Sequence, residues 1–277
     1  MMMKVFIITG ANKGIGYGIV RNLLKLVKDS TIFLTARNEE RGLEAMDGVL
    51  KEVGTMKDPS VHLKFHQLDI TDEGSCLKFK NYLESEKYKI DVLINNAGFA
   101  FNIDATESAL VQAKSTIGIN YYGTKMVSKY LIPLIKDGGR IVNICSMCGQ
   151  MGGYYSKDKI DLFKSNTYTE KDIDDFVERY IDSCEPDVRA TKGYPCSSYR
   201  VSKAAEIALT LLYARQLKDR NIRAIACCPG YVATDMTNYK GPLTIDEGTV
   251  TPLFCALNDD APSGEFIQHC KVSKWLD

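Results

Sequence analysis

The sequence predicts an α/β fold in which a doubly wound parallel sheet of about seven strands forms a single domain. Short apolar runs recur along the chain, and most lack the alternation of a half-exposed strand, as expected for parallel strands covered by helices on both faces. Longer amphipathic stretches, such as residues 15–27 and 204–217, separate them. This alternation favours right-handed crossovers. The apolar runs are residues 5–8, 32–34, 62–67, 92–94, 140–145, 223–228 and 265–268.

Composition excludes several classes of protein. The chain has 277 residues, of which 45% are hydrophobic and 25% charged, which excludes a disordered, collagen-like or coiled-coil chain. Lys plus Arg equals Asp plus Glu at 35, so we expect neither nucleic acid nor a membrane surface as partner. The first apolar run is too short for a signal peptide. Nine cysteines without framework spacing indicate a reduced, cytoplasmic protein.

The first strand leads into a glycine-rich turn, residues 9–16, which opens the first helix. Glycines permit a tight turn and let a phosphate approach the backbone, while the helix N-terminus supplies free N–H groups and a positive dipole end. The strand before and the helix after provide the context that a dinucleotide-binding loop requires. The alternative is a glycine-rich turn that binds nothing.

The second strand ends at Thr35, Ala36, Arg37 and Asn38, without an acidic residue. An acid at this place binds the ribose 2′-hydroxyl of NAD. Arg37, with Lys13 in the glycine-rich turn as a second cation, instead suits a 2′-phosphate. The sequence therefore predicts NADPH/NADP+ as cofactor; the alternative is a solvated arginine in a loop.

Polar residues follow the fourth and fifth strands, at the sheet edge where open α/β folds place their ligands. They are the stretch 95–98 and Ser146, whose hydroxyl can donate to a carbonyl oxygen. Asn120 stands in a helical stretch, where asparagine is a poor helix former. The alternatives are a helix-capping serine and an exposed helix asparagine.

Cys145 and Cys148 form a CxxC pair around Ser146. A zinc site would need a second ligand pair, and the three histidines lie far away in sequence. A thioredoxin-like redox site is the other alternative. We favour packing at the end of a buried strand, and we expect no metal.

Residues 150–195 interrupt the alternation of strands and helices. Thr169 and Asp172 have the spacing of a capping box, and an apolar stripe follows at helical spacing. About 45 residues bury too little surface to fold alone, so we expect a helical insertion docked on one domain that spans residues 1–277. The stripe comprises Ile173, Phe176, Val177, Tyr180, Ile181 and Cys184.

Tyr199 and Lys203 are four residues apart and share one face of the next helix. A free tyrosine has a pKa of about 10, and a nearby ammonium lowers that pKa because it favours the phenolate. The pair alone is weak evidence in a chain with 15 tyrosines.

Taken together, these residues resemble the classical short-chain dehydrogenases/reductases, and within them the monomeric NADPH-dependent carbonyl reductases. The order and spacing of the motifs fit over the whole chain. The motifs are residues 9–16, 95–98, Asn120, Ser146, Tyr199 with Lys203, and 229–230. The subgroup resemblance rests on residues 12–16, 34–37, 65–70 and 227–230 and on the 53 positions from Ser146 to Tyr199.

The resemblance implies a Rossmann-type, NADP-binding fold and a role for each catalytic residue. Tyr199 would protonate the carbonyl oxygen during reduction. Lys203 would lower the pKa of Tyr199 and hold the nicotinamide ribose. Ser146 would polarise the carbonyl, and Asn120 would help to hold a water that links Lys203 to solvent.

The resemblance also implies the binding residues. The substrate pocket would include Ser146 with Tyr194 and Tyr231, which stand where relatives carry tryptophan. The cofactor would contact Gly10, Asn12, Lys13, Gly14, Ile15, Gly16, Arg37, Asn38, Asp69, Ile70, Asn96, Ala97, Tyr199, Lys203, Val232 and Thr234.

The expected activity is NADPH-dependent reduction of ketones, aldehydes or quinones to alcohols by hydride transfer. One alternative is NADP+-dependent oxidation of a hydroxysteroid or prostaglandin-type alcohol. Another is an inactive NADPH-binding scaffold or redox sensor. The helices over residues 116–136 and 199–220 resemble those through which most relatives associate. The insertion should cover them, which predicts a monomer.

Overall fold

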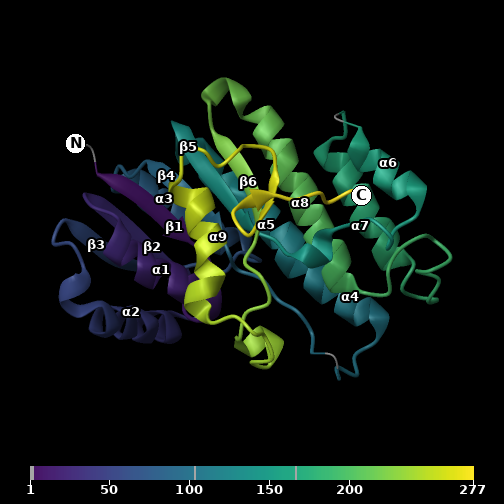
Figure 1. Cartoon of the computed structure of the whole chain (residues 1–277), viewed down its shortest axis with the longest axis horizontal. Helices are drawn as coiled ribbons and strands as arrows, with labels where there is room; N and C mark the ends of the chain where they lie inside the picture. Colours follow the sequence, from purple (N-terminus) through teal and green to yellow (C-terminus); the bar gives the residue numbers. More distant parts are fainter. Residues whose placement is uncertain (1–2, 103, 166) are drawn as a thin grey trace.

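Over residues 3–102, 104–165 and 167–277, which the computed structural model describes, eight strands form one sheet in the order β3-β2-β1-β4-β5-β6-β7-β8 (Figure 1). All neighbours pair in parallel except β7 and β8. The strands are β1 (Lys4–Ile8), β2 (Ser30–Ala36), β3 (Val61–Gln67), β4 (Ile90–Asn95), β5 (Ile135–Ile144), β6 (Arg223–Cys228), β7 (Phe266–Gln268) and β8 (Lys271–Val272).

The doubly wound sheet and its seven expected strands are confirmed, with two differences. The antiparallel strand β8 was not expected, because its two exposed residues carry no apolar pattern. Strand β5 begins at Ile135 rather than 140, and its register with β4 shifts between Ile90 and Val92. A polar, glycine-containing start hid this part of β5 from the hydrophobic pattern.

Strand β1 pairs in parallel with both β2 and β4, so the chain winds away from it in two directions. From β1 the chain continues to the first helix on one face of the sheet, and from β4 it continues to the helices on the other face, so the carboxyl edge at these two strands is a topological switch point. Open α/β sheets bind ligands at such a switch point.

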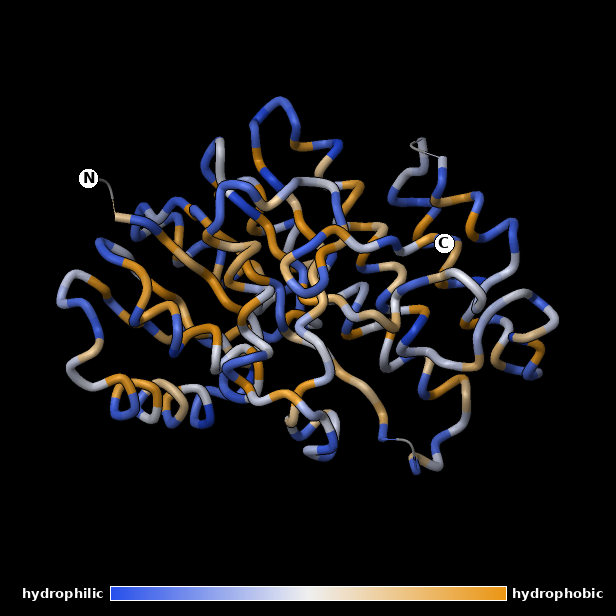
Figure 2. The backbone as a smooth tube through the Cα atoms, in the orientation of Figure 1, coloured by the Kyte–Doolittle hydropathy of each residue, from blue (hydrophilic) through white to orange (hydrophobic). Residues whose placement is uncertain are grey.

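Helices cover both faces of the sheet, and the side chains of β1 alternate between two buried clusters. Phe6 and Ile8 pack beneath α1 (Gly14–Leu26), α2 (Glu39–Val53) and α9 (Ile245–Leu257). Val5 and Ile7 belong to the opposite cluster. Figure 2 shows hydrophobic colouring along the strands and hydrophilic colouring in the outer loops. The opposite face carries α3 (Glu73–Ser85), α4 (Ala109–Ile117), α5 (Thr124–Leu131) and α8 (Ser198–Gln216).

Helices α4 and α5 form one path that a π-helical turn, Gly118–Gly123, interrupts. The path ends in a 3-10 turn, Ile132–Leu134, that contains Pro133. The expectation of a helix reaching residue 136 is therefore wrong. Proline cannot continue the helical hydrogen bonds, and Ile135 already begins β5.

The insertion folds into α6 (Lys157–Lys164) and α7 (Glu170–Asp182), which lie beside α8 on the side remote from β1–β3 (Figure 1). The predicted capping box is present, because Thr169 and Asp172 hydrogen-bond each other's backbone N–H groups at 2.8 and 3.3 Å. Helix α7 contacts both α8 and α4. Most of the expected stripe is buried, namely Ile173, Phe176, Val177, Tyr180 and Cys184, while Ile181 is half-buried.

Within the described residues, no helix is both long enough and apolar enough to span a membrane.

Replacing Ile173 by alanine should lower the free energy of unfolding by about 2–5 kcal/mol, because a fully buried side chain leaves a cavity. The matched control is Val111→Ala on the exposed side of α4, which should change it by less than about 0.5 kcal/mol. Denaturant titration measures both. Equal losses would show that the insertion is not docked through this stripe.

Candidate active site

The glycine-rich turn after β1 lies against the loop after β4. Gly10 and Gly14 have φ values of +61° and +59°, which favour glycine. A Cβ on Gly10 would lie 2.8 Å from the Cα of Ala97, and one on Gly16 would lie 2.4 Å from Nδ2 of Asn96. Larger residues at these positions would push the two loops apart.

Hydrogen bonds join the same two loops. Nδ2 of Asn96 donates to the carbonyls of Thr9 and Gly10 at 2.9 and 3.1 Å. Oγ1 of Thr9 accepts from the backbone N–H groups of Asn96 and Ala97 at 3.0 Å each. The Asn96 side chain therefore stabilises the conformation of the glycine-rich turn. Its amide is used within the protein, so it would affect a cofactor through the shape of that turn.

The N-terminus of α1 is open to an anion. Among the described residues, no side chain caps it and no acid stands in its first turn. Unpaired N–H groups and the helix dipole then favour a phosphate. Lys13 lies at this end, exposed, with Nζ 2.7 Å from Oδ2 of Asp235 in the loop after β6. Asn12 and Ile15 are half-buried beside it.

The ends of β2 and β3 lie next to each other beyond the glycine-rich turn. Arg37 is exposed, and the described residues give its guanidinium no ion-pair partner. Asn38 caps α2 by accepting from the N–H of Arg41 at 2.8 Å. Asp69 is half-buried and accepts from Thr71, whereas Ile70 is buried. Arg37 thus offers an exposed cation at this edge that can meet a ligand.

Ser146 and Tyr199 come together at the ends of β5 and α8. Ser146 follows β5 directly, and its Oγ accepts from the N–H of Cys148 at 3.1 Å. Tyr199 stands in the first turn of α8, which Ser197 caps by accepting from the N–H of Arg200 at 3.3 Å. Gly149 allows the two elements to touch, because a Cβ there would lie 2.8 Å from the Lys203 backbone. The Ser146 hydroxyl acts on the Tyr199 phenol by lowering its pKa.

Lys203 is buried directly behind this pair. Its Nζ donates to the carbonyl of Ile144 at 2.9 Å and lies 5.8 Å from the Tyr199 ring centroid. Its Nζ also lies 2.6 Å from Oε2 of Glu206, a buried carboxylate that the sequence interpretation missed. The available signal was a single acid in the otherwise uncharged helix segment 204–214.

Burial raises the pKa of Tyr199, and Lys203 and the Ser146 hydroxyl act in the opposite direction. The expected influence of Lys203 is therefore present, but desolvation of the phenolate outweighs it. The phenol of Tyr199 is accordingly held protonated at neutral pH.

Asn120 lies in the π-helical turn and is fully buried, so the alternative of an exposed helix asparagine is wrong. Its Oδ1 accepts from the N–H of Phe99 at 2.7 Å. Its Nδ2 donates to the Phe99 carbonyl and to Oγ of Ser202, both at 2.9 Å. The side chain ties the loop after β4 to α8, and π-helical turns occur frequently at functional sites.

The residues expected around the nicotinamide and the substrate separate into two groups. Thr234 lies beside Gly14, where a Cβ would be 3.5 Å from Cγ2 of Thr234, and Tyr231 is 49% exposed. Val232 instead packs towards Gly248. Tyr194 is buried in the insertion, and its hydroxyl donates to the Phe176 carbonyl at 2.9 Å. The structure thus commits Tyr194 to the core of the insertion and leaves Tyr231 open.

Cys145 is buried, whereas Cys148 is half-buried. Burial raises the pKa of Cys145 well above its usual range, which disfavours the thiolate needed for redox chemistry or metal binding. The described residues contain no cluster of His, Cys, Asp or Glu suited to a metal ion.

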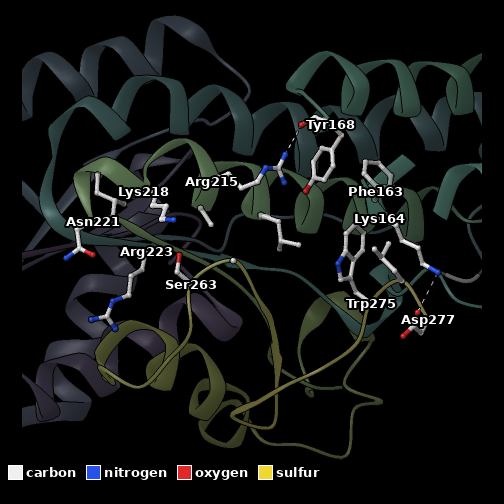
Figure 3. A pocket seen from close by; sticks show the side chains of 15 residues that line it. Phe163, Lys164, Tyr168, Arg215, Lys218, Asn221, Arg223, Ser263, Trp275 and Asp277 are labelled. Carbon is white, nitrogen blue, oxygen red and sulfur yellow. Dashed lines mark hydrogen bonds and ion pairs between the residues drawn. The ribbon is translucent and has the colours of Figure 1, made fainter. Parts of the chain in front are cut away.

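A cavity of about 640 Å³ lies at the other end of α8 (Figure 3). Arg215, Lys218, Arg223 and Trp275 contribute to its wall. Because Arg223 begins β6, this cavity lies at the amino edge of the sheet, away from Ser146 and Tyr199. We therefore place the chemistry at the carboxyl edge.

Known proteins are similar to this chain in sequence. A family model described as short chain dehydrogenase matches residues 4–157 and 188–242, and the unmatched stretch between them lies within the insertion. The NADPH carbonyl reductase 3 of Mus musculus is 35% identical over 280 residues, covering 98% of each chain. The NADPH carbonyl reductase 1 of Mus musculus is 36% identical over 281 residues with the same coverage.

A solved structure is similar throughout. Salutaridine reductase from Papaver somniferum matches with a TM-score of 0.84 at 28% identity, over 96% of this chain and 100% of the other. The chain belongs to the short chain dehydrogenase family.

Proposed function

We propose that this protein is an NADPH-dependent carbonyl reductase that converts ketones, aldehydes or quinones to alcohols. The observation that carries the proposal is the buried Lys203 ammonium, which is held on the carbonyl of Ile144 at the carboxyl end of β5 and lies 5.8 Å from the ring centroid of Tyr199. The Ser146 hydroxyl also acts on Tyr199 by lowering its pKa. The relatives named NADPH carbonyl reductase support the same activity.

The loops after β1 and β2 would fit a dinucleotide with a 2′-phosphate. The uncapped N-terminus of α1 and the glycine-rich turn would hold the pyrophosphate. Arg37 would meet the 2′-phosphate, and Lys13 would join it by leaving Asp235. Ile70 and Asp69 would line the adenine, and Thr234 would lie near the nicotinamide end.

When bound, the cofactor supplies a hydride to the carbonyl carbon. Ser146 would donate a hydrogen bond to the carbonyl oxygen and hold it against Tyr199. The Tyr199 phenol would transfer its proton to that oxygen as negative charge develops there. Lys203, anchored on the Ile144 carbonyl, would stabilise the resulting phenolate until solvent returns a proton.

The substrate would be bulky and apolar. The loops after β5 and β6 expose Met147, Tyr154, Tyr231, Met236 and Tyr239 by 41–67%. These loops are adjacent, since the N–H groups of Met147 and Gly230 both donate to the Cys228 thiol. Exposed apolar side chains next to a polar catalytic pair are typical of a site for an apolar carbonyl compound.

We further propose a monomeric, cytoplasmic enzyme made of one domain with an insertion at residues 150–195. Helix α7 lies on α4 and α8, which include the helices through which most classical relatives are expected to associate. A second copy would have to displace Ile173, Phe176 and Val177 from buried positions.

Tyr199→Phe should lower kcat by about 10²–10⁴-fold, because the transition state loses its proton donor. The ring remains, so the Kd for NADPH should stay within about twofold of the original value. Steady-state assays and cofactor titration measure the two quantities. A variant that keeps more than about a tenth of the original kcat would rule out Tyr199 as the acid.

Arg37→Ala should weaken NADPH binding by about tenfold or more and leave NADH binding nearly unchanged, because it removes a charge-assisted contact to the 2′-phosphate. Titration of both cofactors measures this. Lys28→Ala, an exposed cation just before β2 at the opposite edge, is the control and should affect neither. Equal weakening of both cofactors would show that Arg37 does not contact the phosphate.

Light scattering at micromolar concentration should give a mass near 30.9 kDa. A mass two or four times larger would contradict the covering role of α7.

A further inference from the structure

Lys203 and Glu206 form a buried ion pair one helical turn apart on α8. Their side chains are 5% and 1% exposed, and Nζ lies 2.6 Å from Oε2. The other carboxylate oxygen is 3.5 Å from Oγ1 of Thr124. Apart from the ammonium, Oε2 has no hydrogen-bonding partner among the described residues. Each charge is therefore the principal compensation for the other.

The pair lies between the sheet and the catalytic tyrosine. Lys203 reaches the last carbonyl of β5, at Ile144, two residues before Ser146. A Cβ on Gly98 would be 3.7 Å from Nζ of Lys203, so the loop after β4 also approaches the ammonium closely. The position of the ammonium is thus fixed by two contacts, one with the Glu206 carboxylate and one with the last carbonyl of β5.

An isolated ammonium behind Tyr199 would strongly favour the phenolate. A carboxylate 2.6 Å from that ammonium converts the single charge into a dipole, whose field at the phenol is weaker. Burial alone would lower the pKa of Lys203, but the Glu206 carboxylate more than offsets this effect. Burial raises the pKa of Glu206 to about 7 against the opposing charge of Lys203.

We propose that Glu206 is a positioning residue that acts through Lys203: it holds the ammonium at the end of β5 and moderates its charge, so that Tyr199 keeps its proton in the range where reduction requires a donor. This inference rests on the proposed role of Tyr199 as the acid. It adds a residue that favours the protonated form of Tyr199, which carbonyl reduction requires.

Among the described residues, the other charged groups near the three side chains have their own contacts. Arg200 lies over the Tyr154 ring, with its guanidinium carbon 3.7 Å from the centroid. On α5 and α7, Lys125 pairs with Asp174 and Glu170 at 2.7 and 2.9 Å. The other neighbours are the thiols Cys145, Cys148 and Cys228 and the uncharged Ser146, Asn120, Ser202 and Thr124.

The test is an ultraviolet difference titration of the cofactor-free enzyme, in which the Tyr199 contribution is isolated by subtracting the titration of Tyr199→Phe. Glu206→Gln keeps the shape of the side chain and removes its charge. The Tyr199 midpoint should fall by about one pH unit, because the Lys203 charge is no longer moderated. The pH profile for oxidation of an alcohol with NADP+ should move in the same direction.

Glu84→Gln is the matched control, since it removes a carboxylate from an exposed pair with Lys80. It should leave the Tyr199 midpoint unchanged. If Glu206→Gln does not fold, Glu206→Asp, which retains the charge but withdraws it from Nζ, should give a smaller shift of the same sign.

An unchanged midpoint overturns the inference. So does a rise, which would mean that Lys203 loses its proton without Glu206. The titration needs neither cofactor nor turnover. If the Tyr199 midpoint falls as expected in Glu206→Gln but the original protein reduces no carbonyl compound, the proposed function alone is contradicted.

Discussion

Helix α8 is enclosed by the sheet, by α4 and by α7, and the positions of the Tyr199 and Lys203 side chains follow from that enclosure. Thirteen of its 19 residues are buried, far more than the single stripe of an ordinary surface helix. Ala204, Ala205 and Ala208 let it approach its neighbours closely. Lys203 and Glu206 are consequently removed from water, where their charges act strongly on the nearby phenol.

The insertion contributes to this enclosure from outside the residues that perform the chemistry. Aromatic rings of Tyr155, Phe163 and Tyr194 surround Phe176 at centroid distances of 5.1–5.9 Å and extend the buried cluster of this sheet face into the insertion. The tail that follows β8 joins it, since the Trp275 ring lies 5.7 Å from Phe163. Helix α7 therefore covers α8 as a packed unit rather than as a loose helix.

Most of the fold could be predicted from the sequence, because apolar runs of strand length and a glycine-rich turn are local signals. The proximity of Tyr199 and Lys203 could also be predicted, since they are one turn apart on the same helix. Other features depend on tertiary contacts. The burial of Asn120 depends on the loop after β4, and the orientation of Tyr194 depends on a carbonyl of α7. The two residues of β8 form a strand through their antiparallel pairing with β7, which their own sequence does not indicate.

The burial of the Glu206 carboxylate depends on its ion-pair partner, Lys203. Burying a carboxylate costs free energy that a buried ion pair recovers only when its geometry is close and its remaining valences are satisfied. Here Oε2 depends on one ammonium and Oε1 has a weak contact with Thr124. Replacement of a buried ion pair by well-packed apolar residues is often neutral or stabilising. In the proposed mechanism Lys203 acts on Tyr199, and its buried ammonium requires a counter-charge. In the proposed mechanism this buried ion pair costs stability of the fold but places a defined charge next to the proton donor. The burial of α8 is in this way linked to the chemistry proposed at its first turn.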